Sequence, residues 1–418
     1  MATMISNLPR DLMEVILSRV PLKSMRAVRL TCKNWHTLSI TISESLAKMY
    51  ISKTTRESRE GESTIITLMN YKLCLMSLVV DVDPYIEHKG KLTCFNLEHQ
   101  VKISQVFYYE GLFLCVLKDD TITTRLVVWN PYWGQTRQIK TRYSHHAFSG
   151  RDSTYMFNYS LGYENKNSCR SHKLLRFIDY HRNYRGLHQF FWYEIYDFDS
   201  DLWTTLDVTP HWFIAISQSG VSLKGNTYWC ARKRSSGYSD HIICFDFTRE
   251  RFGPLLPLPF SFIDRHHSCV ILSCVSEEKL AVLFQYKDQY YYKNVVEIWI
   301  TAKLEAEMVS WSKFLRINTG PIIHTSFFIN EEKKVAIGFN DNRKTINIIG
   351  EAGYLRELDL GEHAEPYRRR HVFSYVPSSV QIKETAPGNI KKHQSSLETR
   401  LFDRNMLRFV AFEKKVSE

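Results

Sequence analysis

The sequence predicts two kinds of structure in one chain, a short N-terminal segment of three helices and a large all-β domain built from repeated four-stranded units. Three observations support this prediction. Residues 5–48 carry apolar residues at helical spacing, most later segments are rich in β-branched and aromatic residues, and these strand-like segments recur at intervals near fifty residues. The 418 residues are 44% hydrophobic, which is enough for a packed core and excludes a largely disordered chain.

Charge and cysteine usage indicate an intracellular protein. The formal net charge of +11 is a mild bias over 418 residues and favours acidic partners or nucleic acid only weakly. The nine cysteines are odd in number and form no C-x-x-C, which favours reduced, buried thiols over a disulfide framework or a zinc site. No apolar run approaches the ~18 residues of a membrane helix, and charges interrupt the first twenty residues, unlike a signal peptide. We therefore expect a protein of the cytoplasm, the nucleus or both, without membrane binding.

The first helix is predicted over residues 9–19, between the start signals Asn7 and Pro9 and the stop signal Pro21. It carries two apolar stripes about 100° apart: Leu12, Val15 and Ile16 in one, and Met13, Leu17 and Val20 in the other. A short helix that is apolar over most of its girth must be buried on most sides, and a segment of about fifty residues offers too little surface for this. The rest of the chain or another protein therefore has to cover it.

Two further short helices are predicted near residues 23–30 and 32–40. The basic residues Lys23, Arg26, Arg29 and Lys33 follow one face at spacings of three, three and four. The pattern fits a helix-turn-helix that inserts one helix into a DNA groove. It also fits a small bundle packed on the main domain, or a docking module for a partner with acidic rims and an apolar groove.

The run LPRDLMEVILSRVPLKSMRAVRLTCKNWHTL resembles an F-box: a Leu-Pro opening, a D-L-x-x-x-I-L helix, V-P-L-K-S, and then R-x-T-C-K-x-W. The resemblance covers residues 5–40 and implies docking on a Skp-type adaptor within a cullin–RING ubiquitin ligase. It assigns adaptor contacts and the core of the bundle together to Leu8, Pro9, Leu12, Ile16, Leu17, Val20, Pro21, Leu22, Leu30, Cys32 and Trp35. We place this domain at residues 2–48, and its apolar faces exceed what a groove-reading DNA helix would leave exposed.

After a polar linker at residues 49–62, strand-like units repeat, for example LVVWNPYWGQTRQI (126–139) and IICFDFTRERFGPL (242–255). An alignment on Phe95, Trp129, Tyr196, Phe245, Trp299 and Ile348 gives steps of 34, 67, 49, 54 and 49 residues. Gly225, Glu278 and Glu332 mark turns 20, 21 and 16 residues before the last three of these positions. Spacings near fifty, with about four strands each, are typical of β-propeller blades, and about six would fill residues 63–376. A stacked β-sandwich is the alternative.

The same region resembles the plant F-box-associated interaction domain. The resemblance rests on VWNPYWGQTRQI, EIYDFDSDLWTTLDVTP, GVSLKGNTYWCA, FDFTRERFGPLLPLPF and SFFINEEKKVAIGFN, which occur in order between residues ~95 and 380. It implies substrate capture and a kelch-like propeller, although no Gly-Gly doublet or Trp-Asp dipeptide of a strict kelch or WD40 repeat is present. We place this domain at residues 63–380.

Signatures of catalysis and of metal binding are weak. Asp197, Asp199 and Asp201 resemble the start of a calcium loop, but Leu202 and Val208 stand where the loop needs Gly and Glu, so an acidic hairpin turn is the better interpretation. The pairs at 145–146 and 266–267 are adjacent histidines, which point to opposite faces of a strand and make poor metal clamps. No G-x-S-x-G, G-x-G-x-x-G or P-loop occurs. We expect no catalytic residue, no metal and no cofactor.

Four other features have a structural and a functional interpretation. Cys32 is interpreted as a packing thiol rather than a ubiquitin acceptor. Trp133 and Trp212 are candidates for a binding surface at blade turns, although tryptophans in such sheets are mostly core. The basic run 368–370 is interpreted as a solvated loop, with a nuclear address as the alternative. Residues 381–418 form a tail of unassigned role, in which Leu397, Leu401, Met406, Leu407 and Val410 predict an amphipathic helix.

The function that these observations predict is that of a non-catalytic adaptor. The F-box docks on a Skp-type protein and through it on a cullin–RING ligase, and the β domain holds an unidentified substrate protein, with no nucleic acid and no membrane involved. Two other classes stay open. A propeller hydrolase would need inward-facing Asp and Glu with raised pKa around one pocket, and a nucleic-acid binder, suggested by the charge of +11, would show steep salt dependence.

Overall fold

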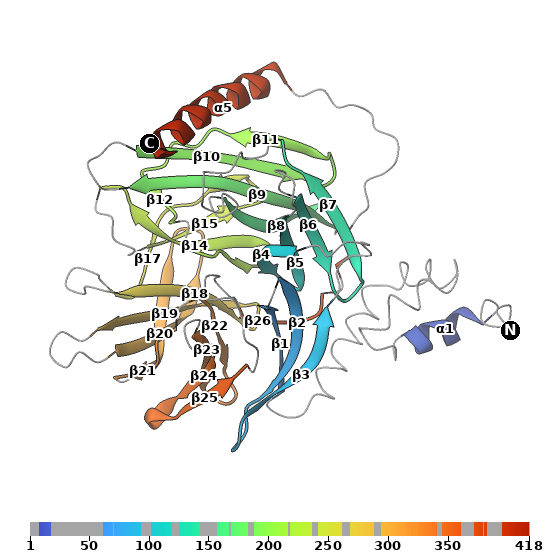
Figure 1. The fold of residues 1–418 in the computed structure, drawn as a ribbon, viewed down its shortest axis with the longest axis vertical. Coiled ribbons are helices and arrows are strands. Elements are labelled where there is room, and N and C mark those ends of the chain that lie inside the picture. The colour runs from blue at the N-terminus through green and yellow to red at the C-terminus, as the bar shows by residue number, and fades with distance from the viewer. Residues whose placement is uncertain are drawn as a thin grey trace.

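A computed structural model of the chain describes residues 8–17, 62–69, 71–92, 102–118, 125–142, 157–166, 169–182, 188–215, 218–235, 241–260, 268–287, 294–318, 320–323, 325–340, 345–360, 372–378, 380–382 and 395–417. Six antiparallel sheets surround a common centre, each one blade of a β-propeller (Figure 1). The predicted propeller of about six blades is confirmed, and the sandwich alternative is wrong.

Five of the blades are formed by consecutive strands. They comprise β4 (Lys102–Tyr109), β5 (Leu112–Lys118), β6 (Arg125–Asn130) and β7 (Gln135–Lys140); β8 (Asn158–Lys166), β9 (Cys169–Arg182), β10 (His188–Asp197) and β11 (Leu202–Leu206); β12 (Trp212–Phe213), β13 (Val221–Leu223), β14 (Asn226–Lys233), β15 (His241–Asp246), β16 (Arg251–Phe252) and β17 (Leu256–Pro257); β18 (Cys269–Val275), β19 (Lys279–Lys287), β20 (Asn294–Leu304) and β21 (Val309–Ile317); and β22 (Phe327–Asn330), β23 (Val335–Asn340), β24 (Thr345–Gly350) and β25 (Leu355–Asp359). A short 3-10 helix, η4 (Glu351–Gly353), joins the last two strands.

The remaining blade closes the ring by combining the two ends of the domain. The strands β1 (Glu62–Met69), β2 (Lys72–Val79) and β3 (Tyr85–Leu92) come from its N-terminal end, and the innermost strand, β26 (Val372–Ser374), comes from its C-terminal end. β26 pairs antiparallel with β1, so that Phe373 lies opposite Ile66. Because two distant segments share one sheet, the ring cannot open without breaking this strand pair.

The repeat alignment made from the sequence identified one strand type correctly in five blades. Trp129, Tyr196, Phe245, Trp299 and Ile348 lie in β6, β10, β15, β20 and β24, which are the third strands of their blades counted from the centre. Phe95, the first aligned position, lies outside the described residues. In the closing blade, β26 takes the innermost place, which makes β2 the third strand there.

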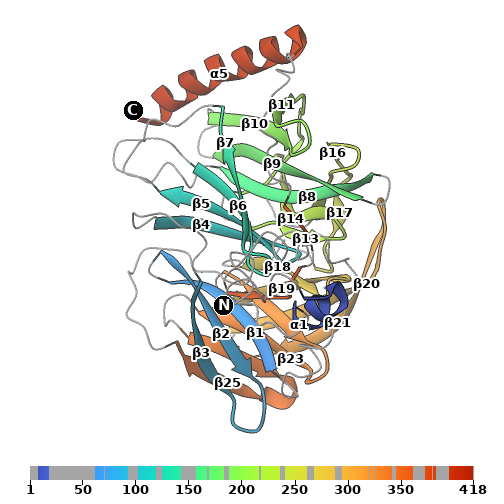
Figure 2. The same ribbon diagram turned by 90° about the vertical axis from the view of Figure 1, so that its right-hand side faces the viewer.

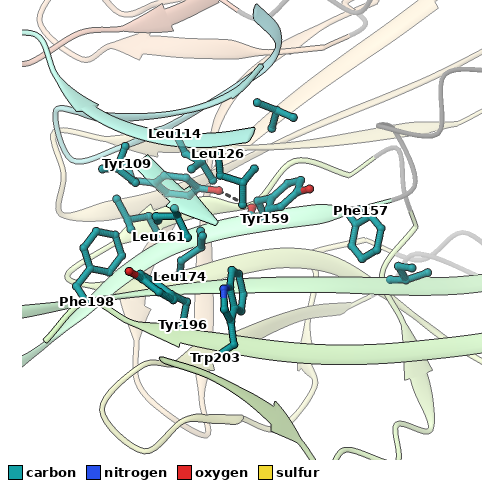
Figure 3. Packing of buried hydrophobic residues seen from close by; sticks show 14 of the residues in the cluster. Tyr109, Leu114, Leu126, Phe157, Tyr159, Leu161, Leu174, Tyr196, Phe198 and Trp203 are labelled. Carbon is teal, nitrogen blue, oxygen red and sulfur yellow. Dashed lines mark hydrogen bonds between the residues drawn. The ribbon is translucent and has the colours of Figure 1, made fainter. Parts of the chain in front are cut away.

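The hydrophobic core is divided into six clusters, one at each interface between adjacent blades. Figure 3 shows the cluster between the β4–β7 and β8–β11 blades, where the Tyr109 hydroxyl donates a hydrogen bond to the Tyr159 carbonyl oxygen at 2.5 Å. Strands in the middle of a blade are buried on both faces, as β23 and β24 are at every position. A single four-stranded sheet cannot bury both apolar faces, and radial stacking of blades satisfies this requirement.

The C-terminal segment contributes a long helix, α5 (Ser396–Ser417), which lies along the blade that contains β10 and β11 (Figure 1, Figure 2). The predicted helix is confirmed, but Leu397, Leu407 and Val410 of the predicted apolar stripe are exposed. Aromatic residues form the buried face instead, and the Phe412 ring stacks on Phe190 at 5.0 Å between centroids. Within the described part of the chain, neither helix has the length and apolar character needed to cross a membrane.

Candidate functional sites: the N-terminal helix and the propeller channel

The first described helix, α1 (Arg10–Leu17), presents an apolar face to solvent. It begins after Pro9, whose carbonyl oxygen accepts a hydrogen bond from the Met13 N–H at 3.0 Å. Leu12, Val15 and Ile16 are 49%, 51% and 36% exposed, whereas Met13 on the second predicted stripe is 7% exposed. The two stripes predicted from the sequence therefore have different environments, and the one formed by Leu12, Val15 and Ile16 faces outward.

Most of the predicted adaptor-contact residues lie beyond the part that the structure describes. Leu8 is half-buried and Pro9 is exposed, and both directly precede α1. Leu17 is described only as the last residue of the helix. The predicted contacts outside the described residues are Val20, Pro21, Leu22, Leu30, Cys32 and Trp35.

A cavity of about 130 Å³ lies on the propeller axis. Its walls come from β4, β13, β18, β22 and β26 and from the residues flanking them, so it is lined by the innermost strands of five blades. The lining combines aromatic rings, hydroxyl groups and two carboxylates: Phe107, Tyr108, Phe327, Phe328 and Phe373; Ser222, Ser273, Thr325, Ser326 and Ser374; and Glu110 and Glu277. An apolar cavity with a few polar groups is the usual form of a binding site.

Glu110 lies in the β4–β5 turn and connects three blades. Its Oε1 accepts a hydrogen bond from the Gly225 N–H at 2.8 Å and one from the Ser222 hydroxyl at 3.4 Å. Its Oε2 lies 3.5 Å from Nη1 of Arg170, which is on β9. These partners hold Glu110 in place, so its carboxylate links the inner turns of neighbouring blades.

Glu277 lies in the β18–β19 turn at the same end of the cavity, and its carboxylate has no hydrogen bond or ion pair among the described residues. Burial raises the pKa of Glu277, the Glu110 charge raises it further, and the Arg170 charge lowers it. The neighbouring Cys274 also lines the cavity. Burial, with the charges of Glu277 and Glu110, raises the pKa of the Cys274 thiol to about 12, so the thiol stays protonated at neutral pH and is a poor nucleophile.

The other sequence candidates that the structure describes do not line this cavity. Asp197 ends β10, and Asp199 and Asp201 lie in the turn to β11, so these residues form the acidic hairpin that the sequence favoured. Among the described residues, no group of three possible metal ligands occurs. In this turn the Ser200 N–H donates to Asp197 Oδ1 at 2.7 Å. Trp133 and Trp212 are buried, so their proposed place on a binding surface is wrong. The histidine pairs and the basic run at 368–370 lie outside the described residues.

Glu110 and Glu277 were not recognised from the sequence. Glu110 follows β4 directly and Glu277 is the second residue after β18, and each stands in the turn from an innermost strand to the second strand of its blade. The available signal was the repeat itself, since the β4–β5, β18–β19 and β22–β23 turns each carry an acidic residue and lie at one end of the channel. Using that signal requires the strand order within each blade, which the spacing alone does not provide.

Comparison with known protein families places the chain in one class. The family of the F-box domain matches residues 5–42, and that of the F-box associated beta propeller domain matches residues 64–382. The chain therefore belongs to the F-box proteins that carry an F-box-associated β-propeller, and the fold and the helical segment described above are the two parts of that architecture.

Individual relatives agree with this assignment. The chain is 96% identical over its full length to an Arabidopsis thaliana protein, F-box/kelch-repeat protein At1g48625, all of which is covered. It is 56% identical to F-box protein At2g38590 of the same plant, with 99% of each chain covered. Among solved structures, a putative 6-phosphogluconolactonase from Bacteroides uniformis matches 75% of this chain and 100% of its own, at 12% identity and a TM-score of 0.38, which carries no argument about function.

Proposed function

We propose that the chain is a substrate-recognition adaptor of a Skp–cullin–F-box ubiquitin ligase. In this proposal, residues 2–48 dock on a Skp-type adaptor and residues 63–380 hold a substrate protein. The observation that carries the proposal is the exposure of Leu12, Val15 and Ile16 on one face of α1, within a matched F-box domain. An apolar helix face is suited to a hydrophobic groove on a partner, since burying such side chains contributes up to about 1.5–3 kcal/mol each.

The proposed mechanism is proximity, without bond chemistry on this chain. A substrate held by the propeller stays near the ubiquitin-conjugating enzyme that the cullin complex recruits, and the raised effective concentration accelerates transfer. At the cavity, the high pKa of the Cys274 thiol agrees with this mechanism, because that thiol stays protonated and does not accept ubiquitin at neutral pH.

Two valine substitutions test the docking step. Val15→Asp places a charge in the proposed interface, and Val82→Asp makes the same change at an 89% exposed valine beyond β2 in the propeller. We expect Val15→Asp to weaken binding to a purified Skp-type adaptor by about a hundredfold, since an unpaired carboxylate is costly to bury, and Val82→Asp to leave it unchanged. Equal affinities for the two variants, measured by titration calorimetry, would contradict the proposal.

A propeller hydrolase is the second candidate, and one observation favours it. Glu110 and Glu277 lie at one end of the cavity, and Glu277 has a raised pKa, as expected of an acid catalyst. However, Glu110 already accepts hydrogen bonds from Gly225 and Ser222, whereas hydrolysis of a glycoside requires two carboxylates available to the substrate. Hydrolysis of nitrophenyl glycosides or esters that is lost in Glu277→Gln would support the hydrolase.

A further inference from the structure

The cavity on the propeller axis has the size of one side chain. Its volume is about 130 Å³, and a cavity of about 150 Å³ accommodates a benzene-sized group. Phe107, Tyr108 and Phe373 contribute aromatic rings to the wall, and Val106 and Leu272 add aliphatic groups. A leucine or phenylalanine side chain matches this space and this chemistry, whereas a folded domain cannot enter it.

One end of the cavity carries excess negative charge. Glu110 and Glu277 both lie there, and no lysine, arginine or histidine is among the described residues that line the cavity. Arg170 is the nearby cation, and it pairs with Glu110 at 3.5 Å while its guanidinium stacks on the Tyr163 ring at 4.2 Å. Arg170 pairs with Glu110 and also acts on Glu277 through its charge, so two carboxylates share one cation and this end of the cavity keeps a negative charge that an incoming cation can neutralise.

The polar groups inside the cavity also include one without a partner. The buried Oγ1 of Thr325 makes no hydrogen bond within the described part of the chain. It precedes β22, about six residues before the β22–β23 turn, and so lies deeper than Glu277, which is in the corresponding turn of its own blade. A buried hydroxyl without a partner costs free energy that a peptide N–H or C=O group recovers by binding to it.

From this arrangement we propose that the cavity binds a short segment of the substrate in which an apolar side chain fills the cavity and an adjacent lysine or arginine pairs with Glu277. The inference rests on the proposed function, because it names the class of peptide that the adaptor selects. Charge complementarity determines the choice: the apolar lining accepts the first side chain, and the unpaired, partly desolvated carboxylate requires a cation. An acidic neighbour in the peptide would face two carboxylates and is disfavoured.

The test is an array of peptides Ac-Gly-Gly-X-Z-Gly-Gly that covers all pairs of residues at X and Z, probed with the full-length chain. We expect enrichment of pairs that combine an apolar residue with lysine or arginine. In fluorescence anisotropy, the best peptide should bind Glu277→Gln about tenfold more weakly. Glu331→Gln is the matched control, since Glu331 lies in the equivalent β22–β23 turn but does not line the cavity.

The possible results separate this inference from the proposed function. Enrichment of apolar–basic pairs that Glu277→Gln abolishes and Glu331→Gln retains supports the inference. Absence of enrichment, enrichment of acidic pairs, or equal effects of the two substitutions overturns it. Binding of the Skp-type adaptor is measured on the same three proteins and depends on α1, so normal adaptor binding without a basic preference refutes the cavity assignment alone.

Discussion

The packing of α5 against the blade of β10 and β11 predicts how much a truncation on this helix lowers the stability of the chain. Phe409 is 2% exposed, and its ring lies 5.5 Å from that of Phe190 and 6.2 Å from that of Trp192. Phe409→Ala removes this packing. Truncation of a fully buried phenylalanine costs about 3–5 kcal/mol, and undocking of α5 limits the loss, so we expect a decrease of about 3 kcal/mol in the free energy of unfolding.

Leu407 provides the control on the same helix. It is 75% exposed, so Leu407→Ala is expected to change stability by less than about 0.5 kcal/mol. Urea unfolding followed by tryptophan fluorescence measures both variants, and brief proteolysis reports whether α5 becomes accessible before the propeller unfolds. Equal midpoints and equal cleavage for the two variants would refute the packing of α5 described here.

Three further substitutions test the blade contacts. The Glu398 carboxylate accepts two hydrogen bonds from the Arg142 guanidinium, at 2.7 and 3.0 Å, so Glu398→Gln should lower the free energy of unfolding by about 1.5–3 kcal/mol. An unchanged melting temperature would argue against this pair. Burial raises the pKa of Asp179 to about 6, so the folded chain binds a proton at this carboxylate more tightly than the unfolded chain does. The free energy of unfolding should therefore fall as the pH rises through 6, by about 1.4 kcal/mol between pH 5 and 7.5. Asp179→Asn should remove this pH dependence in urea titrations. Gly162→Ala places a Cβ 2.1 Å from the buried Phe247 ring and should lower the free energy of unfolding in urea by about 1–3 kcal/mol. Gly253→Ala places its Cβ no nearer than 3.8 Å to any atom beyond its chain neighbours and should be close to neutral.

The sequence predicted the propeller because its repeat is dominated by the third strand of each blade. That strand is buried on both faces over much of its length, so it is rich in apolar residues, and the buried Trp129 in β6 and Ile348 in β24 follow this rule. The closing blade broke the pattern because β26 pairs with β1 across most of the chain, and spacing along a sequence does not contain that contact.

The sites were predicted less completely, for two physical reasons. The periodicity of the first helix identified two apolar stripes, but only the structure shows that Leu12 and Ile16 face solvent while Met13 does not. The cavity is assembled from the innermost strands of five blades, so Glu110 and Glu277 are 167 positions apart in sequence and nearby in space. Local pattern cannot detect such a pair.

Assembly of the ligase tests the central claim most directly. The full chain, a Skp-type adaptor and the N-terminal region of a cullin are mixed, and the mass of the complex is measured by size-exclusion chromatography with light scattering. The proposed adaptor predicts one complex with a single copy of each protein, which Val15→Asp disrupts and Val82→Asp leaves intact. A folded chain that elutes alone beside a complex of the other two proteins would contradict the claim.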